Sequence, residues 1–93
     1  MRYMADSRPA EGVLPEQVRE YFDANGVSSG AWEMVRHHVV TDYAFKVGEP
    51  PGVVLFVNTD SEAAARQLVD SLPVVVQGLL TFHLEPIGLF MHL

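Results

Sequence analysis

The strand-length run Gly52–Val57 constrains the fold more than any other part of the chain. Its sequence, Gly-Val-Val-Leu-Phe-Val, contains no polar side chain. Because successive side chains of a strand point to opposite faces, we expect both faces of this strand to be buried. The run therefore predicts a strand inside a sheet that is covered on both sides.

A helix and another strand are predicted after this run. The helix begins within Asn58–Ser61 and stops at Leu72-Pro73. Thr59 and Glu62 have the spacing of a capping box, although Asp60 or Ser61 could cap the helix instead. One apolar stripe follows at helical spacing and consists of Ala65, Leu68, Val69 and Leu72. The run Val74–Val76 is too short for a further helix, and a strand is expected at Leu80–Glu85.

The first half of the chain supplies the remaining predicted elements. They are a short strand at residues 2–5, a loop at 6–12, a helix at 15–25, a turn of helix at 31–34 and a long strand at 35–47. Gly48–Gly52, with its two prolines, is suited to a hairpin loop. The strand that ends at Val47 should therefore be antiparallel to the Gly52–Val57 strand.

The resulting order, (β)αββαβ, fits an α+β fold with a ferredoxin-like antiparallel sheet and both helices on one face. We expect one domain over residues 1–93, since this length suits a single small domain. Two helices cover only one face, so a second copy of the sheet is the simplest cover for the other. The chain should form a homodimer, or a higher oligomer built from it.

The charge balance bears on the possible partners. The 93 residues include six basic and twelve acidic side chains, for a formal charge of -6, and show no Lys/Arg cluster. Nucleic acid is therefore not an expected partner. The chain has no cysteine, its start has no apolar leader segment, and its apolar runs are too short to span a bilayer. We expect a cytoplasmic protein without membrane contact.

Titratable groups within predicted strands are the candidates for catalysis, because a buried polar group needs a partner and often has a shifted pKa. His38 and Asp42 share a strand face but are about 13 Å apart. His83 could complete a polar cluster with them and transfer a proton. The alternative is that these histidines serve only in structural or interface hydrogen bonds.

Histidine and aromatic residues are also to be considered as ligand-binding groups, for a metal ion and for an organic ligand. Adjacent His37 and His38 would point to opposite faces of a strand, so no metal site is predicted. Four aromatic residues could line a cavity between helices and sheet for an aromatic or lactone ligand, or could simply belong to the core: Tyr21, Trp32, Tyr43 and Phe56. No phosphate loop or nucleophile elbow is present in the sequence, and no cofactor is expected.

Three segments form a familiar combination: Gly52–Ala63, then Leu68-Val-Asp-Ser-Leu-Pro73, then Leu80-Thr-Phe-His-Leu-Glu-Pro-Ile87. Together they resemble the C-terminal half of muconolactone isomerase and its relatives. The resemblance implies the dimeric α+β-barrel fold, a superfamily that also includes small cofactor-free monooxygenases. The N-terminal half departs from the isomerase pattern, so no catalytic residue is carried over from it.

Two functions follow as hypotheses. The first is a cofactor-free catalyst that isomerises or oxygenates a small aromatic or lactone-like compound, with His83, His38 and Asp42 handling protons. The second is a non-catalytic homodimer that binds a ligand or assists another protein.

Overall fold

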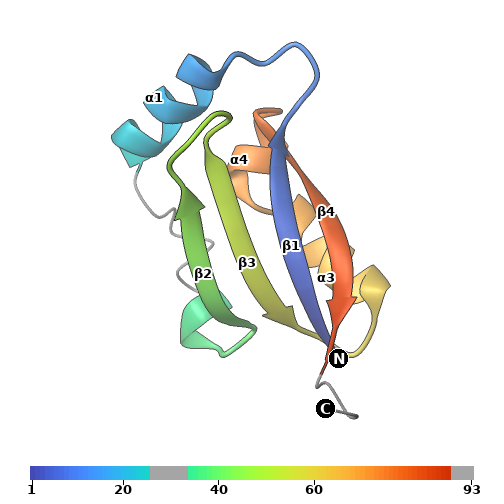
Figure 1. Ribbon diagram of the computed structural model, residues 1–93. Coiled ribbons are helices and arrows are strands. Elements are labelled where there is room, and N and C mark those ends of the chain that lie inside the picture. The colour runs from blue at the N-terminus through green and yellow to red at the C-terminus, as the bar shows by residue number, and fades with distance from the viewer. Residues whose placement is uncertain (26–33, 89–93) are drawn as a thin grey trace.

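The chain folds around one four-stranded antiparallel sheet with the strand order β2-β3-β1-β4 (Figure 1). The structure, a computed structural model, describes residues 1–25 and 34–88. Its elements are β1 (Arg2–Pro9), α1 (Pro15–Asn25), β2 (Val40–Lys46), β3 (Gly52–Asn58), α3 (Glu62–Asp70), α4 (Pro73–Val76) and β4 (Leu80–Ile87). The chain is thus an α+β protein, and its strand order is compatible with a ferredoxin-like fold.

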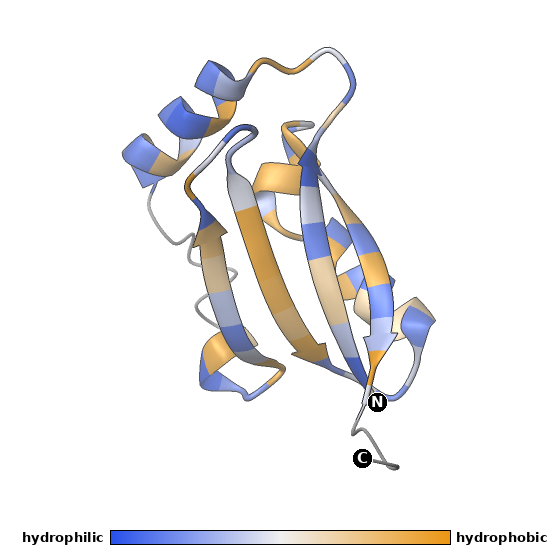
Figure 2. Cartoon of the chain, in the orientation of Figure 1, coloured by the Kyte–Doolittle hydropathy of each residue, from blue (hydrophilic) through white to orange (hydrophobic). Residues whose placement is uncertain are grey.

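Strand β3 is apolar on both faces, as the sequence predicts. It lies between β1 and β2, pairs with both, and is hydrophobic along most of its length in Figure 2. Val53, Leu55 and Val57 are buried, whereas Val54 and Phe56 point to the other face and remain half-buried. The two faces of β3 therefore differ in how well this single chain covers them.

The inner face of the sheet carries the core and is covered by α3 and α4, which lie behind the sheet in Figure 1. Every strand contributes to it by alternation. Its buried strand residues are Tyr3, Ala5, Ser7, Val40, Val53, Leu55, Val57, Leu80, Phe82 and Leu84. Helix α3 adds Ala65 and Val69 from the predicted apolar stripe, with Leu72 just beyond its end.

Helix α3 begins where the sequence places a cap. Ser61 is the N-cap, and its hydroxyl accepts a hydrogen bond of 3.1 Å from the Ala64 N–H. The Thr59 hydroxyl instead donates a hydrogen bond of 2.8 Å to the Ser61 carbonyl. Of the predicted caps, Ser61 is therefore the correct one. The chain then turns through α4, a single helical turn with Pro73 at its start. The prediction that Val74–Val76 is not helical is wrong.

Helix α1 lies at one corner of the sheet, beside the β2–β3 hairpin (Figure 1). Its bounds agree with the predicted helix, and it contributes Val18 and Tyr21 to the core. Arg19 forms an ion pair with Glu49 in the hairpin loop, and the Phe22 ring packs edge-on against Phe45 at 5.7 Å. No helix of the described residues is long and apolar enough to cross a membrane.

Strand β1 is longer than predicted. The expected loop at 6–12 is wrong for its first four residues, because β1 runs to Pro9 and pairs with β4 over Arg2–Pro9. Pro9 is accommodated because it is the last residue of the strand. The longer β1 therefore brings Asp6 and Arg8 into the sheet, on one of its two central strands.

Strand β2 is shorter than the predicted strand at 35–47. Residues 34–36 are helical, and His38 has a φ of 60°, in the left-handed region, so extended structure begins only at Val40. A register shift between Val40 and Asp42 then turns Asp42, Ala44 and Lys46 to one side and Tyr43 and Phe45 to the other. The predicted antiparallel hairpin between β2 and β3 is confirmed.

The outer face of the sheet is turned away from α3 and α4. We define it by the residues that alternate with the core positions: Arg2, Met4, Asp6, Arg8, Asp42, Ala44, Lys46, Val54, Phe56, Thr81, His83 and Glu85. Met4, Val54 and Phe56 form an apolar centre, and charged residues surround it. This face carries the charged residues of β1, β2 and β4 that are described next.

Candidate functional site

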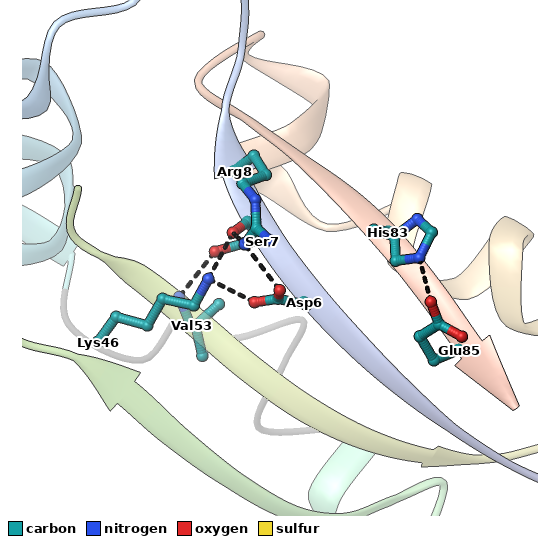
Figure 3. A network of polar contacts seen from close by, with 7 residues as sticks. All are labelled: Asp6, Ser7, Arg8, Lys46, Val53, His83 and Glu85. Carbon is teal, nitrogen blue, oxygen red and sulfur yellow. Dashed lines mark hydrogen bonds and ion pairs between the residues drawn. The ribbon is translucent and has the colours of Figure 1, made fainter. Parts of the chain in front are cut away.

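Three charged residues form a network at one end of the outer face, together with the backbone carbonyl of Ser7 (Figure 3). The Lys46 ammonium, from β2, forms an ion pair with Asp6 and donates a hydrogen bond of 2.8 Å to the Ser7 carbonyl. The Arg8 guanidinium lies 2.7 Å from the Asp6 carboxylate. Two cations thus flank one carboxylate on β1.

The backbone explains why Lys46 reaches β1 across β3. The β1–β3 register ends at Asp6–Val54, and the buried Ser7 hydroxyl accepts a hydrogen bond of 2.8 Å from the Val53 N–H. A Cβ on Gly52 would overlap Ser7 Oγ and would lie 3.6 Å from Lys46 Cδ. Glycine at this position therefore leaves room for both side chains.

The network holds Asp6 in its charged form. The hydrogen bond from Lys46 lowers the pKa of Asp6 most, the bond from Arg8 lowers it further, and partial burial opposes both. A carboxylate that is charged and doubly paired accepts protons poorly. Asp6 is thus better suited to link β1 to β2 across β3 than to act as a general base.

A second polar pair lies on β4. His83 Nε2 is 2.6 Å from Glu85 Oε1, and both side chains are more than half exposed on the outer face (Figure 3). Their spacing of two residues along a strand places them on the same face. His83 is also the cross-strand neighbour of Asp6. An imidazole held by a carboxylate can accept or donate a proton through its other nitrogen.

The three predicted catalytic residues are not brought together in the folded chain. His38 precedes β2 in a turn and is exposed, so the prediction that it shares a strand face with Asp42 is wrong. Asp42 lies on the outer face of β2, where its carboxylate accepts a hydrogen bond of 2.8 Å from the Tyr43 N–H. Since β3 and β1 separate β2 from β4, and His83 is two residues along β4 from the position level with Asp42, the two are roughly 16 Å apart at ordinary strand spacing.

The four predicted ligand-binding aromatics also separate. Tyr21 is buried in the core, and Tyr43 lies on the inner side of β2 with 39% of its surface exposed. Phe56 is on the outer face, where the Arg2 guanidinium carbon lies 5.8 Å from its ring centroid, so it does not line a cavity between helices and sheet. Trp32 lies outside the described residues.

A shallow hollow of about 300 Å³ lies between α1 and the β2–β3 hairpin. Its lining residues are Arg19, Phe22, Asp23, Phe45, Lys46, Val47, Pro51 and Gly52. It combines two aromatic rings with two cations and one carboxylate. His83 and Glu85 are not among its lining residues, so this hollow and the β4 pair are separate features.

Asp6, Arg8 and Lys46 are not among the site residues predicted from the sequence. The signal available was the alternation from Arg2 to Arg8, in which charges at 2, 6 and 8 share one parity and Tyr3, Ala5 and Ser7 the other. Pro9 and Gly12 outweighed this pattern and favoured a loop. Lys46 offered no signal, because its role depends on a strand distant in the sequence.

Within residues 1–25 and 34–88 the structure places no group of three His, Asp or Glu side chains where they could hold a metal ion.

Comparison with protein-family models, with curated proteins and with solved structures found no match for the chain. Fold and site together define an α+β protein with a four-stranded antiparallel sheet, whose outer face has an apolar centre and charged surroundings.

Proposed function

We propose that the chain acts as a homodimer of the dimeric α+β-barrel type, in which two subunits bring their outer faces together. The observation that carries this proposal is the apolar centre of Met4, Val54 and Phe56 on that face. These side chains are only half-buried within one subunit, although they occupy the two central strands of the sheet. An apolar strip with a polar rim is typical of a protein interface.

The charged rim suits pairing with an identical face. Cations at Arg2, Arg8 and Lys46 share the face with carboxylates at Asp6 and Glu85, so both signs are available to a two-fold partner. A standard interface removes about 800 Å² per partner. One subunit exposes 6004 Å², so such a contact would occupy a small part of its surface.

For this dimer we propose cofactor-independent isomerisation or oxygenation of a small aromatic or lactone-like compound. His83 would transfer the proton, and Glu85 would orient and charge-stabilise its ring. The 2.6 Å contact between them supports this assignment. Packing two outer faces together would surround this pair, which is exposed in one subunit, with the walls of a binding chamber.

The dimer is tested by Met4→Lys, with Val76→Lys as the matched control. The introduced ammonium would lie opposite Glu85 in its own subunit, which favours folding, yet it would place a cation in the apolar strip. Val76 is 72% exposed on α4, away from the outer face. Light scattering should give at least twice the chain mass of 10.3 kDa for the native protein and the control, and a smaller mass for Met4→Lys. A native chain that stays monomeric at all concentrations contradicts the proposal.

Catalysis is tested with a panel of small lactones and phenolic compounds. His83→Ala should lower turnover by about 10²- to 10⁴-fold, since this range is usual for loss of a general base. Thr81→Val, on the same face of β4, should leave turnover unchanged. Equal turnover in His83→Ala and the native dimer would exclude His83 as the proton-transfer group.

The second candidate is a ligand-binding homodimer without catalysis. The separation of the hollow beside α1 from the His83–Glu85 pair favours it, because the aromatic lining and the proton-transfer group are then not in one place. In this case Phe45→Ala should weaken binding of aromatic carboxylates in calorimetry, while His83→Ala leaves binding unchanged. The reverse pattern favours the catalytic assignment.

A further inference from the structure

The two edge strands of the sheet differ in how they are protected. On β4, Arg66 of α3 donates a hydrogen bond of 2.8 Å to the Phe82 carbonyl, and Pro86 has no N–H to offer a further strand. The Ala10 N–H donates to the Leu79 carbonyl, and by alternation the peptide group of Phe82 then points away from β1. Side chains of this chain therefore block the β4 edge.

The β2 edge carries no such protection in the described part of the chain. No strand among residues 1–25 and 34–88 pairs with its outer side. The Tyr43 N–H bonds to the Asp42 carboxylate rather than to β3, so the peptide groups of Tyr43 and, by alternation, Phe45 point outward. The side chains of these two residues are 39% and 45% exposed. Among the described residues, this edge therefore presents backbone without a strand partner together with exposed aromatic surface.

We propose that β2 pairs antiparallel with β2 of a second copy of this chain, about a two-fold axis at Ala44. In this register Tyr43 lies opposite Phe45 of the second copy, and their outward peptide groups form the hydrogen-bonded pairs. Asp42 lies opposite Lys46 of the second copy, on the outer face. The two sheets then join into one sheet of eight strands.

Charge and hydrogen bonding together select this register. The outward peptide groups of Tyr43 and Phe45 must face those of the second copy. This condition allows a two-fold axis at Tyr43, Ala44 or Phe45. An axis at Tyr43 places Asp42 opposite Ala44, and an axis at Phe45 places it opposite Gly48. Only the axis at Ala44 opposes Asp42 to Lys46 twice, and opposite charges across an antiparallel pair are stabilising.

The pairing also compensates for the hydrogen bond of the Tyr43 N–H that it breaks. The bond from the Tyr43 N–H to Asp42 is exchanged for a backbone bond across the axis. Lys46, which pairs with Asp6 in the single chain, would turn from β1 to the freed carboxylate of the second copy and leave Asp6 paired with Arg8. The Tyr43 and Phe45 rings, already edge-on at 6.2 Å within one chain, gain aromatic neighbours from the second copy. This contact uses the backbone of β2, whereas the dimer proposed above uses Met4, Val54 and Phe56, so the inference stands apart from that dimer.

The test is a symmetric disulfide, which the chain allows because it has no native cysteine. In Ala44→Cys the two introduced thiols would face each other at the axis, where directly opposed residues have Cα atoms about 4.5 Å apart. In the control Asp42→Cys they would be about 13 Å apart along the strand, too far for a disulfide. Under mild oxidation, Ala44→Cys should form a linked dimer on a non-reducing gel and Asp42→Cys should not. Equal linkage in both variants, or none in Ala44→Cys, overturns the proposal.

Two further variants separate the edge from the outer face. Asp42→Lys in the Ala44→Cys chain should slow disulfide formation about tenfold, because both attractive pairs become repulsive. Met4→Lys in the Ala44→Cys chain should leave linkage unchanged, whatever it does to the outer-face dimer. If Met4→Lys abolishes linkage, Ala44 is near its counterpart through the outer face, and the edge pairing is wrong. Circular dichroism confirms that each variant is folded.

Discussion

Adjacent residues of β3 show how differently the two faces of the sheet are completed. Leu55 points to the inner face and is 4% exposed, because α3 and α4 close over that side. Val54 and Phe56, of the same apolar character, point to the outer face and remain half-buried. One strand thus supplies apolar side chains to both faces, although helices α3 and α4 cover only the inner one. The inner face therefore governs the stability of the chain, whereas the outer face keeps apolar side chains that the chain itself does not enclose.

The sharpest test of this comparison is a matched pair of truncations on β3. Leu55→Ala should lower the free energy of unfolding by about 2–5 kcal/mol, because it leaves a cavity in a packed core. Val54→Ala should cost about 1 kcal/mol or less within a subunit, since its site is not enclosed. Urea unfolding at several chain concentrations measures both. Equal losses at the lowest concentration would mean that the outer face is as well covered as the inner one.

Gly52 tests the boundary between the faces, where Lys46 crosses β3. Gly52→Ala should destabilise the fold by about 1–3 kcal/mol, because its Cβ would overlap the buried Ser7 hydroxyl. Ser7→Ala removes that oxygen but leaves the Val53 N–H without its acceptor. The double variant should therefore lose less than the sum of the two single losses in thermal unfolding. An additive result would show that Gly52 and Ser7 do not compete for space.

The smallest effect concerns Asp6. Its pKa is lowered in the folded chain, so its ion pairs stabilise the fold above the unfolded-state pKa, and this contribution is lost as the pH falls through the lowered value. Asp6→Asn should cost about 1 kcal/mol at neutral pH. The difference from the native chain should shrink below about pH 4. Asp70→Asn, in an exposed helical pair with Arg66, is the control for a general charge effect. A difference that grows in acid would contradict the assigned pairing.

Much of the fold could be predicted because it follows from local patterns. The α1 bounds, the Ser61 cap among the alternatives, the apolar stripe of α3 and the β2–β3 hairpin all depend on residues close together in the sequence. The extension of β1 to Pro9 and the late start of β2 could not be predicted in the same way. Pairing with β4 overrides the loop tendency of Asp6–Pro9, and the left-handed His38 interrupts a run of strand-forming residues.

The candidate site was less predictable than the fold. His83 is on the outer face, but its partner is Glu85, two residues along the same strand, and the predicted partners His38 and Asp42 lie elsewhere. The Asp6–Lys46 pair joins residues on two strands that are not neighbours in the sheet. Such a pair depends on strand order and on the small size of Gly52, and local composition reveals neither.

The sequence alone determined that β3 is apolar on both sides, because alternation along a strand assigns each side chain to a face whatever the rest of the chain does. It also determined where the main helices begin, since caps and apolar stripes act within a few residues. Only the tertiary structure decided which charges meet, which face the helices α3 and α4 cover, and which edge of the sheet has no strand partner among the described residues. Those outcomes depend on contacts between distant segments, whose geometry is set when the sheet assembles and not by any segment separately.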